Sequence, residues 1–99
     1  MGTFGHRPRG AVTRPTDATR AELRALLYDL ADQLLTSRNG RHVMLDGIHH
    51  AWVLADLADV GEGLARTVLR NLQRDLNDRP VSLDRGYFAA QLTNAADHL

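Results

Sequence analysis

Residues 39–59 read NGRHVMLDGIHHAWVLADLAD, and residues 77–97 read NDRPVSLDRGYFAAQLTNAAD. Nine of the 21 aligned positions carry the same amino acid at a constant offset of 38 residues. Chance would give roughly one or two identities, and a period of about 20 to 50 residues usually marks a repeated supersecondary unit. The sequence therefore predicts two related halves. The matched pairs are Asn39 with Asn77, Arg41 with Arg79, Val43 with Val81, Leu45 with Leu83, Asp46 with Asp84, Ala51 with Ala89, Leu54 with Leu92, Ala58 with Ala96 and Asp59 with Asp97.

Each repeated segment follows a stretch with the apolar spacing of an amphipathic helix. We expect helices from a start between Thr16 and Thr19 to about Ser37, and over 47–59, 64–76 and 85–98. A capping box formed by Thr19 and Glu22 favours the first start, and Asn39-Gly40 is typical of a helix end. The first helix should bury one leucine stripe made of Leu23, Leu26, Leu27, Leu30, Leu34 and Leu35.

The segments 43–45 and 81–83 occupy matching places between two helices in each half. In each segment the first and last residues are apolar, which is typical of a short extended run. We expect these runs to pair as a minimal β-bridge, with plain loops as the alternative. Asp46 and Asp84 would then cap the helices that follow, because an aspartate carboxylate accepts hydrogen bonds from free backbone amides.

These elements predict an all-α, four-helix domain built from two duplicated helical hairpins that are related by a pseudo-twofold axis. The domain should span residues 16–99, with repeat halves at about 16–59 and 60–99. Residues 1–15 combine glycine and proline with Arg7, Arg9 and Arg14 and contain no acidic residue. They predict a flexible basic arm, because they have little apolar surface to bury.

Composition excludes several classes of protein. The chain has 99 residues, is 43% apolar and 24% charged, and has no net charge, which fits one globular domain without a strong electrostatic field. It contains no cysteine, which excludes disulfides, thiolate catalysis and cysteine zinc sites. No apolar run approaches about 18 residues, so we expect a cytoplasmic protein with no membrane partner.

The residues that could carry chemistry do not assemble into a recognised motif. The paired helix-loop-helix outline is that of an EF-hand, but the loop lacks the alternating oxygen ligands that calcium needs. His42, His49 and His50 lie near Asp46 and Asp56, yet a metal site usually needs a second contributing segment. Ser37 and Ser82 lack a nucleophile motif and an evident base. We therefore expect no enzyme activity, no metal and no cofactor.

The predicted helix over residues 47–59 is apolar on nearly all sides. A helix in a small helical bundle needs only one buried stripe, so the additional apolar surface indicates a second contact. Ile48, His49, Trp52 and Val53 are the candidate interface residues, and tryptophan is enriched at binding hot spots. We expect a non-enzymatic interaction, dimerisation or adaptor module whose partner is a second copy of the chain.

A DNA-binding transcriptional regulator is the alternative. Residues 55–72 loosely resemble a helix-turn-helix, which implies that the helix over residues 64–76 acts as a recognition helix. Arg66, Arg70 and Arg74 would contact phosphates, while Asn71 and Gln73 would reach base edges. The overlong turn containing Glu62 and the zero net charge argue against this function, and an arginine row at this spacing also fits a solvated helix face.

Overall fold

The computed structural model describes residues 15–36, 41–78 and 85–99. Four helices form these ranges: α1 (Pro15–Thr36), α2 (Arg41–Leu57), α3 (Leu64–Asp78) and α4 (Arg85–Asp97). No β-strand occurs in the described ranges. The predicted all-α, four-helix class is therefore confirmed. None of the described helices combines the length and the apolar character needed to cross a membrane.

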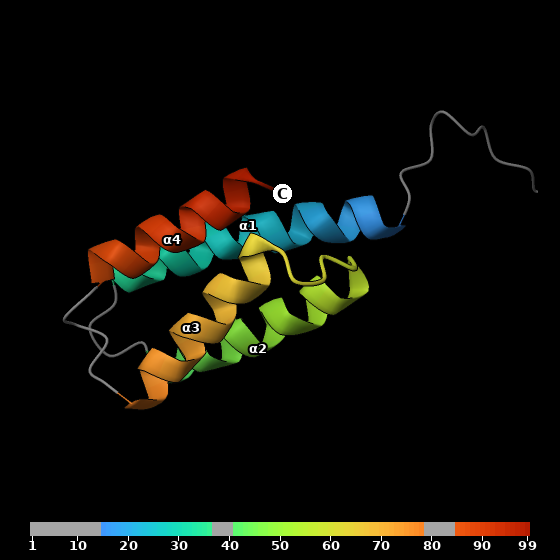
Figure 1. The fold of residues 1–99 in the computed structure, drawn as a ribbon. Coiled ribbons are helices and arrows are strands. Elements are labelled where there is room, and N and C mark those ends of the chain that lie inside the picture. Colours follow the sequence, from blue (N-terminus) through green and yellow to red (C-terminus); the bar gives the residue numbers. More distant parts are fainter. Residues whose placement is uncertain (1–14, 37–40, 79–84) are drawn as a thin grey trace, which may run out of the picture.

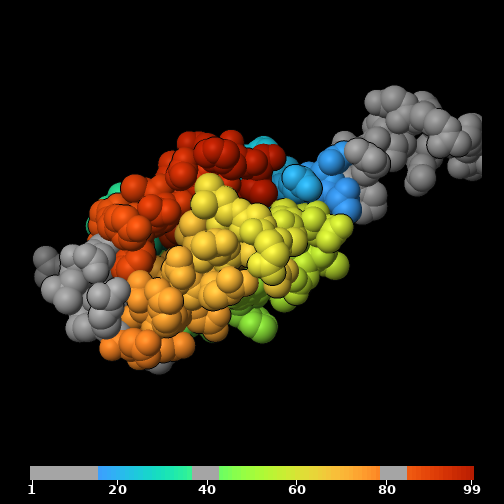
Figure 2. Space-filling view, viewed as in Figure 1, coloured from blue at the N-terminus to red at the C-terminus, as the bar shows by residue number. Residues whose placement is uncertain are grey.

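Successive helices run in opposite directions and form two layers, α1 with α4 and α2 with α3 (Figure 1). Each helix contacts the helices before and after it in the chain, and α4 returns to α1. The contacts of α1 with α4 and with α2 are more extensive than those of α3. The face drawn in Figure 2 is formed mainly by α3 and α4, with the α2–α3 turn beside α1.

All four helices contribute to one hydrophobic core. Its largest fully buried side chains are Leu23, Leu27, Leu30, Leu34, Ile48, Leu69, Leu72, Leu76 and Leu92. The predicted stripe of α1 is largely confirmed by four of these leucines. Leu35 was wrongly included, since it is 58% exposed and lies about 100° around the helix from Leu34. Leu26 is partly buried against the core.

The first two helices begin earlier than the sequence indicated. Helix α1 begins at Pro15, a residue whose fixed φ suits a first helical position, so Thr19 lies inside the helix and does not cap it. Of the predicted basic arm, only Pro15 falls within the described residues. Helix α2 begins at Arg41, so Asp46 is an interior residue and not a cap. Asp84 lies outside the described residues.

The predicted β-bridge is wrong for residues 43–45, because this segment forms the first turns of α2. An extended run would have buried Val43 and exposed Met44. The structure shows the reverse, since Val43 is 56% exposed and Met44 is 2% exposed. Met44 precedes Ile48 by four residues, and this helical spacing places both on the buried face. The proposed pairing segment 81–83 lies outside the described residues.

Helix α2 approaches α1 closely at Gly47. A Cβ atom at this position would lie 2.4 Å from Cδ2 of Leu30, well inside van der Waals contact. Leu30 is itself buried in the core and has little room to move. The sequence placed Gly47 at the start of a helix, whereas it lies inside α2, where a larger residue would have to displace the end of the Leu30 side chain.

A Schellman motif ends α2. The Val60 amide donates to the Ala55 carbonyl at 3.2 Å, and the Asp59 amide donates to the Asp56 carbonyl at 3.1 Å. Asp59 has a φ of 53°, so a non-glycine residue occupies the left-handed position that usually favours glycine. Val60 then folds back onto the core, which fixes where the α2–α3 turn begins.

The Asp59→Gly variant should raise the free energy of unfolding by about 0.5–1 kcal/mol, because glycine has no Cβ to strain the left-handed conformation. Urea denaturation followed by circular dichroism measures the change. The control Ala25→Gly, at an exposed position inside α1, should lower the same free energy by about 1 kcal/mol. A destabilised Asp59→Gly variant would contradict this account of the turn.

Candidate functional site

Trp52 and Arg66 join α2 to α3. The indole N–H of Trp52 donates to Oε1 of Gln73 at 3.1 Å. The guanidinium carbon of Arg66 lies 4.8 Å from the centre of the Trp52 ring, in a cation–π arrangement. Trp52 is therefore half-buried by contacts within the chain, on the side of α2 that faces α3.

Arg66 is held from two sides. Its Nη1 donates to the carboxylate of Asp56, one helical turn beyond Trp52. Its Nε atom is buried and has no hydrogen-bond partner among the described residues. The Arg66 side chain is only 25% exposed, so most of its surface is used inside the molecule.

The rest of the predicted arginine row also faces acidic groups. Nη2 of Arg70 lies 3.7 Å from Oε2 of Glu62, and Nε of Arg74 lies 3.6 Å from Oδ1 of Asp75. Both arginines are more than half exposed. Asn71 and Gln73 are exposed on α3, although Gln73 already accepts the Trp52 hydrogen bond. Each arginine of the row therefore has a carboxylate nearby, although the exposed pairs of Arg70 and Arg74 are weak.

The outward side of α2 carries exposed aliphatic side chains that the core does not cover. Val43 is 56% exposed, Val53 is 44% exposed and Leu57 is 63% exposed. Asp46 and His50 are exposed between them. The five residues recur every three or four positions, which places them along one side of the helix. We call this set, Val43, Asp46, His50, Val53 and Leu57, the outer stripe of α2.

The structure distributes the four predicted interface residues over three environments. Ile48 is 0% exposed and lies in the core, so its side chain has no surface to offer a partner of the folded chain. Trp52 packs against α3. Val53 belongs to the outer stripe, and His49 is exposed next to it. Sequence reasoning missed Leu57, although its spacing of four residues from Val53 within the predicted helix was an available signal. It also missed Val43, because that residue was placed in an extended run before the predicted helix.

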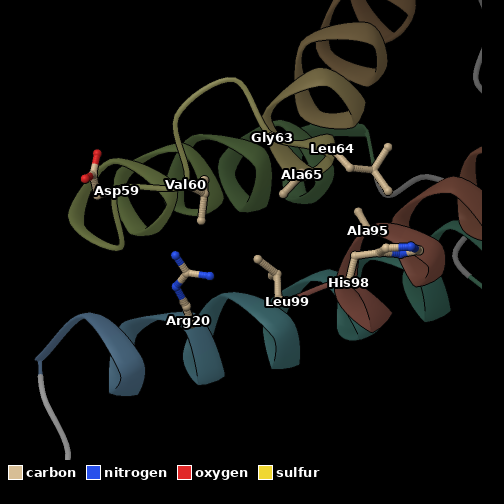
Figure 3. A pocket seen from close by; sticks show the side chains of 9 residues that line it. All are labelled: Arg20, Asp59, Val60, Gly63, Leu64, Ala65, Ala95, His98 and Leu99. Atoms are coloured by element: carbon tan, nitrogen blue, oxygen red, sulfur yellow. The ribbon is translucent and has the colours of Figure 1, made fainter.

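A pocket of about 160 Å³ opens where the start of α1, the α2–α3 turn and the end of the chain meet (Figure 3). Arg20, Val60, His98 and Leu99 are among its lining residues, and the Asp59 side chain points away from it. No sequence signal marked this pocket, because three distant segments form it. Its lining combines aliphatic groups with two basic side chains, and no cluster of metal-ligating residues occurs in the described ranges.

A second polar contact joins α1 to the end of α4. The Tyr28 hydroxyl donates to Oδ1 of Asp97. This hydrogen bond to the carboxylate raises the pKa of Tyr28 above its usual value, and desolvation and the negative charge of Asp97 add to the shift. The contact lies on the surface and ties α1 to the end of α4.

The Arg66→Ala variant should lower the free energy of unfolding by about 1–2 kcal/mol, because it removes both the cation–π contact and the Asp56 ion pair. The matched control Arg70→Ala should change it by less than about 0.5 kcal/mol, since that side chain has only a distant exposed partner. Chemical denaturation measures both. Equal effects of the two substitutions would show that neither the Trp52 contact nor the Asp56 ion pair contributes to stability.

Comparison with known protein families, with curated proteins and with solved structures finds no match to this chain.

Proposed function

We propose that the chain is a small non-enzymatic interaction module that forms a homodimer, or an adaptor contact, through the outer stripe of α2. The observation that carries this proposal is the exposure of Val43, Val53 and Leu57 along one side of a helix whose opposite side is fully buried. Aliphatic side chains aligned in this way gain free energy when a second surface removes them from water.

The spacing of the outer stripe supports a helical partner surface. Its residues lie at intervals of three, four, three and four, which is the pattern of a coiled-coil seam. Such a seam meets a second helix side by side over its length. The α2 helix has 17 residues, which corresponds to nearly five turns, so the seam is long enough for several layers of contact.

The proposed interface differs from the one expected from the sequence, which included Trp52 as an anchor. Trp52 is engaged with Arg66 and Gln73, so aliphatic residues replace the aromatic anchor. Few large side chains are available on the outer stripe, so we expect the association to be weak. The lack of cysteine fits a reducing compartment, and we propose the cytoplasm as the location.

We also propose that the two hairpins arose by duplication, with α1–α2 equivalent to α3–α4. Positions 38 residues apart share burial at Leu30 and Val68 and at Leu54 and Leu92. The two halves also make similar hydrogen bonds to each other. Tyr28 of α1 donates to Asp97 near the end of α4, and Arg66 of α3 donates to Asp56 near the end of α2. The larger contacts of α1 would then be a later departure from symmetry.

The Val53→Asp variant should weaken self-association at least about tenfold, because each dimer would bury two carboxylates among aliphatic groups. Sedimentation over a wide concentration range measures the effect, and circular dichroism should show unchanged helix content, since Val53 is already partly exposed. The matched control Leu35→Asp, at an exposed leucine of α1, should leave association unchanged. A wild-type chain that stays monomeric at about millimolar concentration would refute the proposal.

DNA binding through α3 is the second candidate, favoured by the exposure of Arg70, Asn71 and Arg74 on that helix. The neighbouring carboxylates compete with phosphates for the arginines, so we expect no binding at micromolar protein and about 50 mM salt. Fluorescence anisotropy with a random duplex measures this. Binding that falls steeply with salt, and that disappears in the Arg70→Gln/Arg74→Gln double variant, would favour the regulator function instead.

A further inference from the structure

Four of the five residues of the outer stripe are arranged symmetrically about residue 48. Val43 and Val53 lie five positions before and after it, and Asp46 and His50 lie two positions before and after it. Along the stripe the order is therefore aliphatic, acidic, imidazole, aliphatic. In a twofold dimer the same surface of both copies meets, so this order determines which residues face each other.

Two copies of α2 that cross at residue 48 in opposite directions would bring unlike polar groups together. Val43 of one copy would face Val53 of the second copy, and Asp46 would face His50 of the second copy. The twofold axis generates each pair twice, which gives four layers with an aliphatic pair at each end and two polar pairs in the centre. Leu57 lies one turn beyond the outer layer and can cover its edge.

A parallel arrangement gives the opposite result. Each residue would then face its own copy, so that Asp46 would lie against Asp46 and His50 against His50. Two carboxylates at short distance repel one another, whereas a carboxylate accepts a hydrogen bond from an imidazole N–H in either protonation state. The polar residues in the middle of the stripe therefore select an orientation, as single polar residues do in coiled coils.

Asp46 and His50 are available for such pairs. Both are exposed, and neither makes an ion pair or a side-chain hydrogen bond with another residue in the described part of the chain. Their aliphatic neighbours Val43 and Val53 are also exposed. The neighbouring positions do not block the approach, because Gly47 has no side chain and His49 lies to one side.

We infer that the outer stripe of α2 binds a second copy of this chain in the antiparallel direction, with two reciprocal Asp46–His50 pairs between flanking Val43–Val53 pairs. The inference rests on the proposed self-association and adds its orientation, its register and the residues that specify them. Recognition is thus by shape and by hydrogen-bond complementarity, and it disfavours the parallel arrangement through the Asp46–Asp46 contact.

Two single variants, D46R and H50E, test the register when they are mixed. In the D46R homodimer a guanidinium would face His50 twice, and in the H50E homodimer two carboxylates would face each other twice. In the mixed dimer a guanidinium faces a carboxylate once, and the wild-type Asp46–His50 pair remains once. Each homodimer should therefore be weaker than wild type by about tenfold, whereas the mixed dimer should recover to within about threefold.

Native mass spectrometry separates the three dimers by mass, and sedimentation gives their affinities. Mixing cannot relieve an effect inside one helix, since each chain keeps its own substitution, so recovery reports contacts between chains. The control pair D29R and Q33E, at the same spacing on α1, should mix statistically. Statistical mixing of D46R with H50E would overturn the register while leaving self-association in place. A monomeric wild type would instead overturn the proposed function itself.

Discussion

The structure depends on the packing of α2 against α1, in which Gly47 lies beside the buried side chain of Leu30. A Cβ atom at residue 47 would lie 2.4 Å from Cδ2 of Leu30, so a larger residue would have to displace the end of that side chain. On the same helix, Ile48 and Ala51 face the core and Val53 faces outward. Which side of α2 remains free therefore depends on how the helix packs against its neighbours.

The two remaining sides of α2 have different physical characters. The side toward α3 makes a cation–π contact and a hydrogen bond. The Arg66 guanidinium lies over the Trp52 ring, and the indole N–H of Trp52 donates to Gln73. Trp52 and Gln73 are hydrogen-bonded to each other and Arg66 pairs with Asp56, so this side has little left to offer a partner. The outer stripe differs from this side, because its aliphatic side chains remain exposed to water. This contrast moves the functional hypothesis from the aromatic residue to the aliphatic ones.

Much of the fold could be predicted, since the leucine spacing of α1 and the Val68, Leu72 and Leu76 pattern of α3 have only one reasonable interpretation. The start of α2 could not, because four residues from Val43 to Asp46 fit both an extended run with a cap and a helical turn. The burial of Met44 resolves this ambiguity, and it depends on α2 packing against its neighbours. Local sequence does not contain that information.

The same limit applies to the candidate site. An apolar α2 was evident from composition, but which of its residues face solvent depends on its rotation against α1 and α3. Trp52 looked like an anchor because tryptophan often is one, and only the position of Arg66 and Gln73 shows that it is engaged internally. Val43 was assigned to an extended run and Leu57 was not singled out, although both share one side of the helix with Val53.

Distances between spin labels on two copies of α2 test the account most directly, and the chain contains no cysteine that would compete for the label. Antiparallel pairing centred on residue 48 predicts that labels at His49→Cys lie about 3 Å apart along the helix axis, and labels at Leu57→Cys about 27 Å apart. Strong coupling at the first position and a long distance at the second is the expected result. Similar short distances at both positions, or no coupling at either, would contradict the account.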